Sequence, residues 1–167
     1  QDMSPWISAE MENKFDSRAV IRMPAYADPG REELVFLGDR FGNHLALVYN
    51  RNFVKQPPKT TDELAEIARA STIDENGDGK PERYGLVWNY TEPFFLIPFL
   101  TGFGGWIFAD EGPTPRPHLD TPEVIAALRF VVALRNEHRV IPANCDYEAA
   151  DALFKTGKAA MIINGDW

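Results

Sequence analysis

The sequence predicts an α/β fold in which helices flank a central sheet. From Leu34 onward, short apolar runs of strand length alternate with segments that carry apolar residues at helical spacing. Apolar residues make up 44% of the 167 positions and charged residues 25%, which is typical of a globular chain with its own core. One α/β domain, alone or with a fragment of a neighbouring domain, accounts for this length and pattern.

Residues 1–33 differ from the rest of the chain. Ser4 followed by Pro5 is typical of a helix start, which predicts a short helix from Pro5 to about Phe15. Further prolines and scattered charges follow, and no clear apolar face is present. We therefore expect this stretch to belong to a part of the protein of which only a piece is present.

The next segments predict two strands, a helix and a third strand. Leu34–Leu37 and Leu45–Tyr49 are short apolar runs that indicate buried strands, and Tyr84–Trp88 is another. Between them, Thr60 and Glu63 have the spacing of a capping box, which predicts a helix start. The apolar face of this helix is expected to carry Leu64, Ile67 and Ala68.

A second helix is predicted to begin near Pro93, because proline is tolerated in the first turn of a helix. Pro98 would kink this helix, and glycines from Gly102 onward would end it. Trp106–Ala109 then predicts a short strand.

The longest helix is predicted to start at Thr121, followed by a helix from Tyr147 to Lys155 that Gly157 ends. Ala159–Ile163 predicts a final buried strand. The inward stripe of the longest helix is expected to contain Val124, Ala127, Leu128, Val131 and Leu134.

The charge and the single cysteine exclude several classes of protein. Lys and Arg number 17 against 25 Asp and Glu, which gives a net charge of −8, so no nucleic-acid partner is expected. The longest apolar run, Pro93–Phe103, is shorter than the ~18–20 residues of a membrane-spanning helix. An intramolecular disulfide is excluded because Cys145 is the one cysteine.

The segment from Asp74 to Glu82 has the oxygen-ligand spacing of a calcium-binding loop, with Gly79 at its sharp turn. The candidate ligands are Asp74, Asn76, Asp78, the carbonyl group of Lys80, and Glu82. An EF-hand loop needs a bidentate glutamate at its twelfth position, where this chain has Gly85. A structural calcium site is one interpretation, and a turn stabilised by its own Asp and Asn side chains is the other.

A second candidate site lies where the predicted strand Tyr84–Trp88 ends. Ligands of open α/β sheets bind beyond the carboxyl ends of the strands. Glu92 would accept hydrogen bonds from ligand hydroxyls there, and Phe94 would offer a stacking face. The alternative is an acidic first turn that complements the helix dipole. Trp167 follows a buried strand and a glycine turn, so it either reaches into a cleft or packs in the core.

Hydrolase chemistry has little support in the sequence. The G-x-S-x-G motif is absent, and Cys145 is best explained as a buried, unreactive thiol. Glu92 and Asp110 would suit glycoside hydrolysis only if their carboxylates lay ~5–10 Å apart. A carbohydrate-active enzyme domain or a calcium-stabilised accessory module is therefore the alternative to a binding function. A plain protein-interaction domain is a third hypothesis.

Several short segments, taken in order, resemble the maltose-binding branch of the family 1 extracellular solute-binding proteins of ABC importers. The matching segments are Leu47–Asn50, Pro57–Leu64, Asn76–Lys80, Arg83–Gly85, Glu92–Phe95, Phe103–Gly105, Thr121–Glu123, Ala152–Phe154, Gly157–Met161 and Asn164–Trp167. The resemblance implies a periplasmic-binding-protein-like lobe of a two-lobed, non-enzymatic clamp that closes on a sugar or oligosaccharide. It also implies a membrane permease as partner, a monomeric state, no required cofactor, and an extracytoplasmic location, periplasmic or as an anchored lipoprotein.

The resemblance also assigns parts of the chain and site residues. Residues 1–35 correspond to the end segment of an otherwise missing N-terminal lobe, and residues 36–167 to most of the C-terminal lobe. The implied ligand-binding residues are the acid Glu92 and the aromatic residues Phe94, Trp106, Tyr147 and Trp167. Two positions depart from the family pattern, since Gly38 and Asp166 stand where proline is common, and they leave the class of ligand open.

Overall fold

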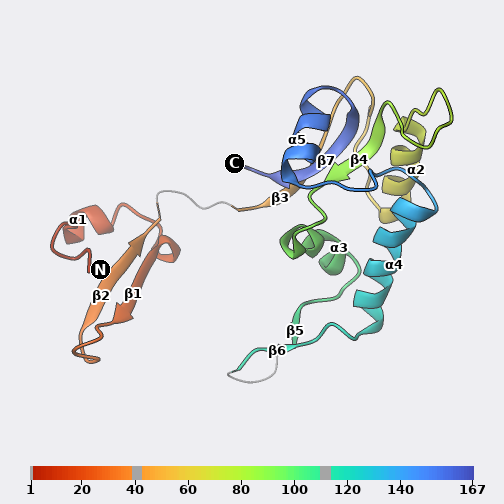
Figure 1. The fold of residues 1–167 in the computed structure, drawn as a ribbon. Coiled ribbons are helices and arrows are strands. Elements are labelled where there is room, and N and C mark those ends of the chain that lie inside the picture. Colours follow the sequence, from red (N-terminus) through yellow and green to blue (C-terminus); the bar gives the residue numbers. More distant parts are fainter. Residues whose placement is uncertain (1, 39–42, 110–113) are drawn as a thin grey trace. The chain divides into compact units, whose positions relative to one another are not determined.

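The computed structural model describes residues 2–38, 43–109 and 114–167 (Figure 1). The chain forms two compact units, one with the residues up to Asn43 together with Trp167, the other with His44–Asp166. The division expected between residues 35 and 36 falls inside a strand of the first unit. The assignment of the two parts to two lobes stays a prediction.

The first unit contains an antiparallel pair of strands, β1 (Val20–Pro24) and β2 (Glu32–Leu37). The strand predicted at Leu34–Leu37 is confirmed, but its predicted burial is wrong. Leu34 is fully buried, whereas Phe36 is 53% exposed, and the register with β1 shifts between these two residues, which interrupts the regular pattern of the strand. The strand β1 was not predicted; it is mostly exposed and ends in a proline.

The helix predicted from Pro5 to about Phe15 is present, but its predicted start and length are wrong. The observed helix, α1 (Ala9–Glu12), is four residues long and begins after Ser8, whose hydroxyl oxygen accepts a hydrogen bond from the Met11 amide (3.2 Å). A 3-10 turn, η1 (Ser17–Ala19), follows. None of the residues of α1 is buried, so no packing extends this helix beyond its single capped turn.

The second unit contains a three-stranded sheet in the order β3–β7–β4. The central strand β7 (Ala159–Gly165) runs parallel to β4 (Tyr84–Trp88) and antiparallel to β3 (Leu45–Tyr49). All three strands are predicted by the sequence, although β7 continues two residues beyond the expected end. β3 alternates between half-buried and exposed residues, so its predicted full burial is wrong.

Helices cover both faces of this sheet, which confirms the predicted α/β fold (Figure 1). Helix α5 (Tyr147–Lys155) packs on one face of the sheet, where Val87 of β4 belongs to the buried cluster between them. Leu86 and Trp88, which point the other way, face the helices of the opposite side. These helices are α2 (Thr61–Ser71), α3 (Ile97–Gly102) and α4 (Pro122–Asn136).

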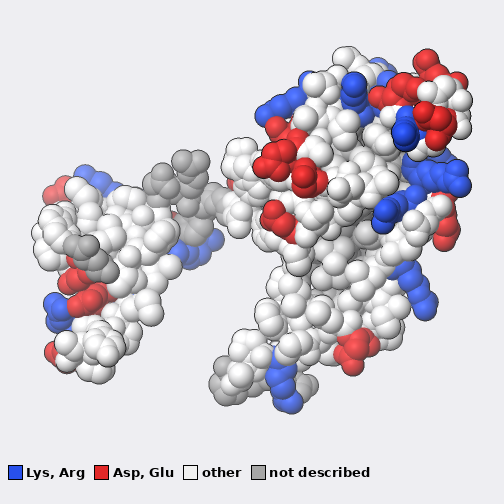
Figure 2. Space-filling model, viewed as in Figure 1, with Lys and Arg blue, Asp and Glu red and all other residues white. Residues whose placement is uncertain are grey.

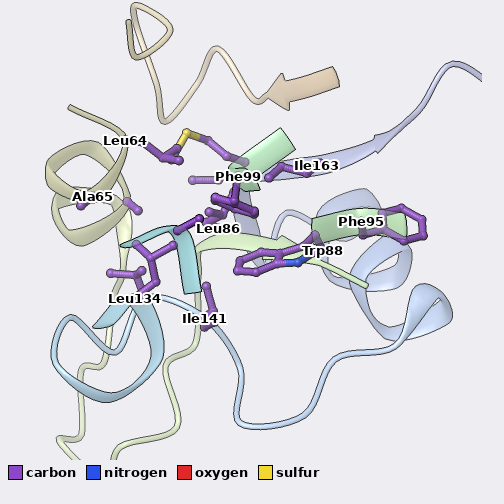
Figure 3. Close-up of a cluster of buried hydrophobic side chains, with 14 of the residues drawn as sticks. Leu64, Ala65, Leu86, Trp88, Phe95, Phe99, Leu134, Ile141 and Ile163 are labelled. Carbon is purple, nitrogen blue, oxygen red and sulfur yellow. The ribbon is translucent and has the colours of Figure 1, made fainter. Parts of the chain in front are cut away.

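The larger core lies between β4 and the helices α2, α3 and α4 (Figure 3). Trp88 is 1% exposed, and its ring centroid lies 5.1 Å from that of Phe99. Leu134 of α4 and Leu86 are fully buried in the same cluster. This core holds the carboxyl end of β4, where the second candidate site was expected, on a rigid base.

Helix α2 shows the capping predicted for it. The Thr60 hydroxyl oxygen accepts a hydrogen bond from the Glu63 amide (3.1 Å), and the Glu63 carboxylate accepts one from the Lys59 amide (2.7 Å). The helix approaches β4 so closely that a Cβ atom on Gly85 would lie 1.9 Å from the carbonyl oxygen of Ala68. This contact requires glycine at the position where an EF-hand would have its bidentate glutamate.

The segment after Glu92 forms two elements rather than one kinked helix. A 3-10 turn, η2 (Pro93–Leu96), precedes α3, so Pro98 lies in the first turn of α3, where no intrahelical amide bond is lost. The strand expected at Trp106–Ala109 is shorter. It is β5 (Phe108–Ala109), which pairs with β6 (Arg116–Pro117), a strand that the sequence analysis missed.

Helix α4 begins after its predicted cap, Thr121, and buries Val124, Ala127 and Leu134. The prediction for Leu128 is wrong, because this side chain is 42% exposed. In the part of the chain that the structure describes, no helix is both long and apolar enough to cross a membrane.

Candidate functional site

The carboxyl end of β4 passes into a turn that a buried asparagine holds. Asn89 is 1% exposed, and its Oδ1 atom accepts hydrogen bonds from the amide (3.1 Å) and the hydroxyl (2.6 Å) of Thr91. Its Nδ2 atom donates to Oε1 of Glu92 (2.8 Å). Glu92 itself is exposed and directly precedes η2. The predicted ligand-binding acid therefore lies at a strand end, with a carboxylate that the protein orients.

Two of the predicted aromatic residues lie close to this turn. Phe94 is 38% exposed and packs edge-on against Phe95, with ring centroids 5.5 Å apart and planes at 83°. Phe95 is buried, and its centroid lies 6.3 Å from that of Tyr147, the first residue of α5. The structure thus brings Glu92, Phe94 and Tyr147 together at one end of the sheet, with the rings joined through Phe95.

A pocket of about 340 Å³ adjoins Glu92 on the side of α4. Its lining is mostly apolar and includes Trp88, Leu128 and Val132, while Arg135 contributes a positive charge. The indole Nε1 of Trp88 is buried and has no hydrogen-bond partner among the described residues. The exposed carboxylate of Glu92 is therefore bordered by an apolar surface, and Phe94, with its exposed ring, follows two residues further along the chain.

Trp106 lies in a different pocket. It is 45% exposed and lines a hollow of about 560 Å³ together with Phe108, Arg116 and Glu123. The pocket beside Glu92 shares none of these side chains. A ligand role for Trp106 stays a prediction that is separate from the Glu92 site.

The two other aromatic predictions have different surroundings. Tyr147 is half-buried and packs against the larger core, so part of its ring is structural. Trp167 is 55% exposed and is grouped with the first unit. Its place on one face with Glu92 and Phe94 stays a prediction.

In the loop between α2 and β4, side-chain oxygen atoms accept hydrogen bonds from backbone amides of the same loop. The Asp74 carboxylate accepts hydrogen bonds from the amides of Gly77 (2.9 Å) and Gly79 (3.0 Å), and Asp78 accepts one from the Lys80 amide (2.8 Å). Figure 2 shows the acidic side chains gathered at this tip of the second unit.

Two further bonds complete this pattern in the loop. Asn76 accepts a hydrogen bond from the Asp78 amide (2.9 Å), and the Glu82 carboxylate accepts one from the Glu75 amide (2.9 Å). No group of three or more His, Cys, Asp or Glu residues is arranged to hold a metal ion in the described ranges. Calcium binding by this loop stays a prediction, and its hydrogen bonds are those expected of the alternative, a self-stabilised turn.

Burial shifts the ionisation of two groups behind the site. It raises the pKa of the Cys145 thiol to about 11, because the thiolate would lose its hydration in the fully buried position. Burial also raises the pKa of Tyr90, whose hydroxyl donates to the carbonyl oxygen of Pro142 (3.0 Å). Both groups are therefore neutral near pH 7. Asp110, the suggested partner of Glu92 in glycoside hydrolysis, lies outside the described residues.

Asn89 is the residue of this site that the sequence analysis did not single out. Its signal was present, because a polar residue at the end of an apolar strand, followed by Thr91, is typical of a side chain that caps a turn. What the sequence could not show is that the same amide also reaches Glu92.

The family comparison matches residues 23–167 to the family described as bacterial extracellular solute-binding protein. The chain belongs to this family. The predicted family is therefore confirmed, and because this is a family of solute-binding proteins, the enzyme alternative is not favoured. The extracellular nature of the family also supports the predicted location outside the cytoplasm.

Two curated relatives illustrate the similarity. A maltotriose-binding protein of Pyrococcus abyssi (strain GE5 / Orsay) is 30% identical over 147 residues, which make up 85% of this chain and 30% of that protein. A maltooligosaccharide ABC transporter solute-binding lipoprotein of Streptococcus pneumoniae (strain ATCC BAA-255 / R6) is 29% identical over 130 residues, or 74% of this chain and 30% of that protein. The chain thus spans about a third of the length of these relatives.

Two solved structures are similar over the whole of this chain. The maltose/maltodextrin-binding domain MalE from Bdellovibrio bacteriovorus bound to maltotriose is 42% identical, with a TM-score of 0.82 and 41% of its own chain covered. The Thermus thermophilus maltotriose binding protein bound with maltotriose is 25% identical, with a TM-score of 0.71 and 42% covered. These structures confirm the predicted lobe of the periplasmic-binding-protein type.

Proposed function

We propose that this chain forms part of the maltooligosaccharide-binding component of an ABC importer. The observation that carries the proposal is the likeness of the whole chain, at 42% identity and a TM-score of 0.82, to a domain solved with maltotriose bound. The curated relatives named above support the same class of ligand, because their names refer to maltotriose and maltooligosaccharides.

The site at the end of β4 suits such a ligand. A sugar ring has an apolar face and a rim of hydroxyl groups. Phe94, with its exposed ring, supplies a stacking surface for the face, and the Glu92 carboxylate accepts hydrogen bonds from the rim. Tyr147, Trp106 and Trp167 are the further aromatic residues that we propose as sugar contacts. The binding requires no cofactor in this proposal.

In this proposal the chain supplies one wall of a cleft and acts as a monomer. Closure of a second lobe over the sugar would exclude water and present the closed form to the membrane permease. The protein would act in the periplasm or as a lipoprotein anchored outside the membrane, as the name of the pneumococcal relative suggests for that protein.

The test is calorimetric titration of maltotriose into the natural protein that carries this sequence. Phe94→Ala should weaken binding by about 5- to 10-fold, because one stacking contact is lost. Glu92→Gln should also weaken it, since a carboxylate accepts a stronger hydrogen bond than an amide. Tyr26→Ala is the control, because Tyr26 is a fully exposed aromatic residue of the first unit. Unchanged affinity in both site variants would refute the proposed site.

A further inference from the structure

Asn89 is a buried polar residue whose side chain serves the turn that carries Glu92. At 1% exposure it cannot hydrogen-bond to bulk water, so its polar atoms need partners inside the protein. The partners that the structure provides are Thr91 and Glu92, two and three residues further along the chain. The amide therefore links the end of β4 to the Glu92 carboxylate.

The orientation of this amide follows from its partners. A backbone amide can only donate, so the Asn89 atom that faces the Thr91 amide at 3.1 Å must be the carbonyl oxygen Oδ1. The other end of the side chain is then Nδ2, a donor, which lies 2.8 Å from Oε1 of Glu92. This donor can hydrogen-bond to an ionised Glu92 carboxylate. An ionised acidic side chain in place of Asn89 could not, because it has no donor.

We infer that Asn89 is a positioning residue, which fixes the Glu92 carboxylate so that its second oxygen meets the hydroxyls of the ligand. Among the residues that the structure describes, Asn89 is the one side-chain hydrogen-bond partner of Glu92. Because the amide is itself held by Thr91, the carboxylate is oriented before a ligand arrives, which lowers the entropy lost on binding. The inference rests on the proposed function.

Asn89→Asp is the diagnostic variant, because it keeps the size of the side chain and replaces the donor by a carboxylate. Two carboxylates would then lie at hydrogen-bond distance and repel each other, unless they share a proton. We expect maltotriose affinity to fall about tenfold at pH 7.5, the loss of one charged hydrogen bond, and to recover as the pH falls towards 5. The natural sequence should show no such recovery.

The double variant Asn89→Asp with Glu92→Gln separates positioning from a general effect on folding. The side-chain amide introduced at position 92 can donate to the new carboxylate, so the pair regains a hydrogen bond and loses its repulsion. We expect affinity close to that of Glu92→Gln alone, with no pH dependence. Asn52→Asp, at an exposed position after β3, controls for the added negative charge. The inference would be overturned if Asn89→Asp reduced maltotriose affinity equally in the natural sequence and in Glu92→Gln, and if this loss did not depend on pH.

A second readout needs no sugar. The side-chain carboxyl carbon of Glu92, followed by 13C NMR, should titrate at higher pH in Asn89→Asp than in the natural sequence. An unchanged titration would overturn the inference even if maltotriose binds. Failure of the natural protein to bind maltotriose would instead refute the proposed function, and the NMR titration would still decide the role of Asn89.

Discussion

Gly85 is predicted to be the position in β4 that tolerates substitution least. A Cβ atom there would lie 1.9 Å from the Ala68 carbonyl oxygen and 2.4 Å from its carbonyl carbon. Real Cβ atoms essentially never approach closer than 3.0 Å, so α2 would have to move by about 1 Å. The two Ala68 atoms belong to a helix backbone, which cannot rotate away as a side chain can.

This movement sets the expected cost of Gly85→Ala. Leu64, Ala65 and Ala68 of α2 lose part of their packing on β4, and overpacking of this kind costs about 3 kcal/mol. Gly102→Ala is the matched control, because the added Cβ meets no atom within 4 Å at the end of α3. Alanine should stabilise that position by about 0.5 kcal/mol, since glycine is the poorer helix former.

The assay is urea unfolding of the two variants and the natural sequence, followed by circular dichroism. We expect a clear loss of unfolding free energy in Gly85→Ala and none in Gly102→Ala. If Gly85→Ala unfolds at the same urea concentration as the natural sequence, the close contact between α2 and β4 is not present, and the base of the Glu92 turn is built differently.

Two further predictions concern the thiol and the acidic loop. With a pKa of about 11 in the folded state, Cys145 should resist iodoacetamide at pH 8 and react fully in urea; equal rates would show that the thiol is accessible. The unfolded state loses this proton first, so the thiol lowers stability only as the pH rises from about 9 towards 11. If the loop from Asp74 to Glu82 binds calcium, millimolar Ca²⁺ should raise the melting temperature, and Asp78→Ala should abolish the rise. The absence of any rise would leave the self-stabilised turn as the explanation.

The parts of the fold that the sequence predicted well are those with local signals. The cap at Thr60 and the uninterrupted apolar run of β4 each depend on neighbours within a few residues. Helix α2 begins where the cap predicts, and β4 has the expected bounds. β1 and β6 were missed because each is stabilised by pairing with another strand rather than by its own pattern.

Helix α4 illustrates a second limit. Its apolar residues occupy more than one side, so periodicity alone could not say that Leu128 and Val132 remain exposed while Leu134 is buried. The site shows the same limit. The residue types at Glu92 and Phe94 indicated hydroxyl and ring recognition, but the link from Asn89 to Glu92 depends on the conformation of the turn.

The most direct test of the proposed function is an NMR titration of the 167-residue chain with maltotriose. One wall of a cleft leaves the other face of the sugar in water, and each exposed hydroxyl contact contributes only about 0.5–1.5 kcal/mol. We therefore predict amide shifts centred on Glu92, Phe94 and Tyr147, with a dissociation constant in the millimolar range or weaker, roughly −4 kcal/mol. Micromolar binding would contradict the shared cleft, and saturable shifts confined to other residues would contradict the site.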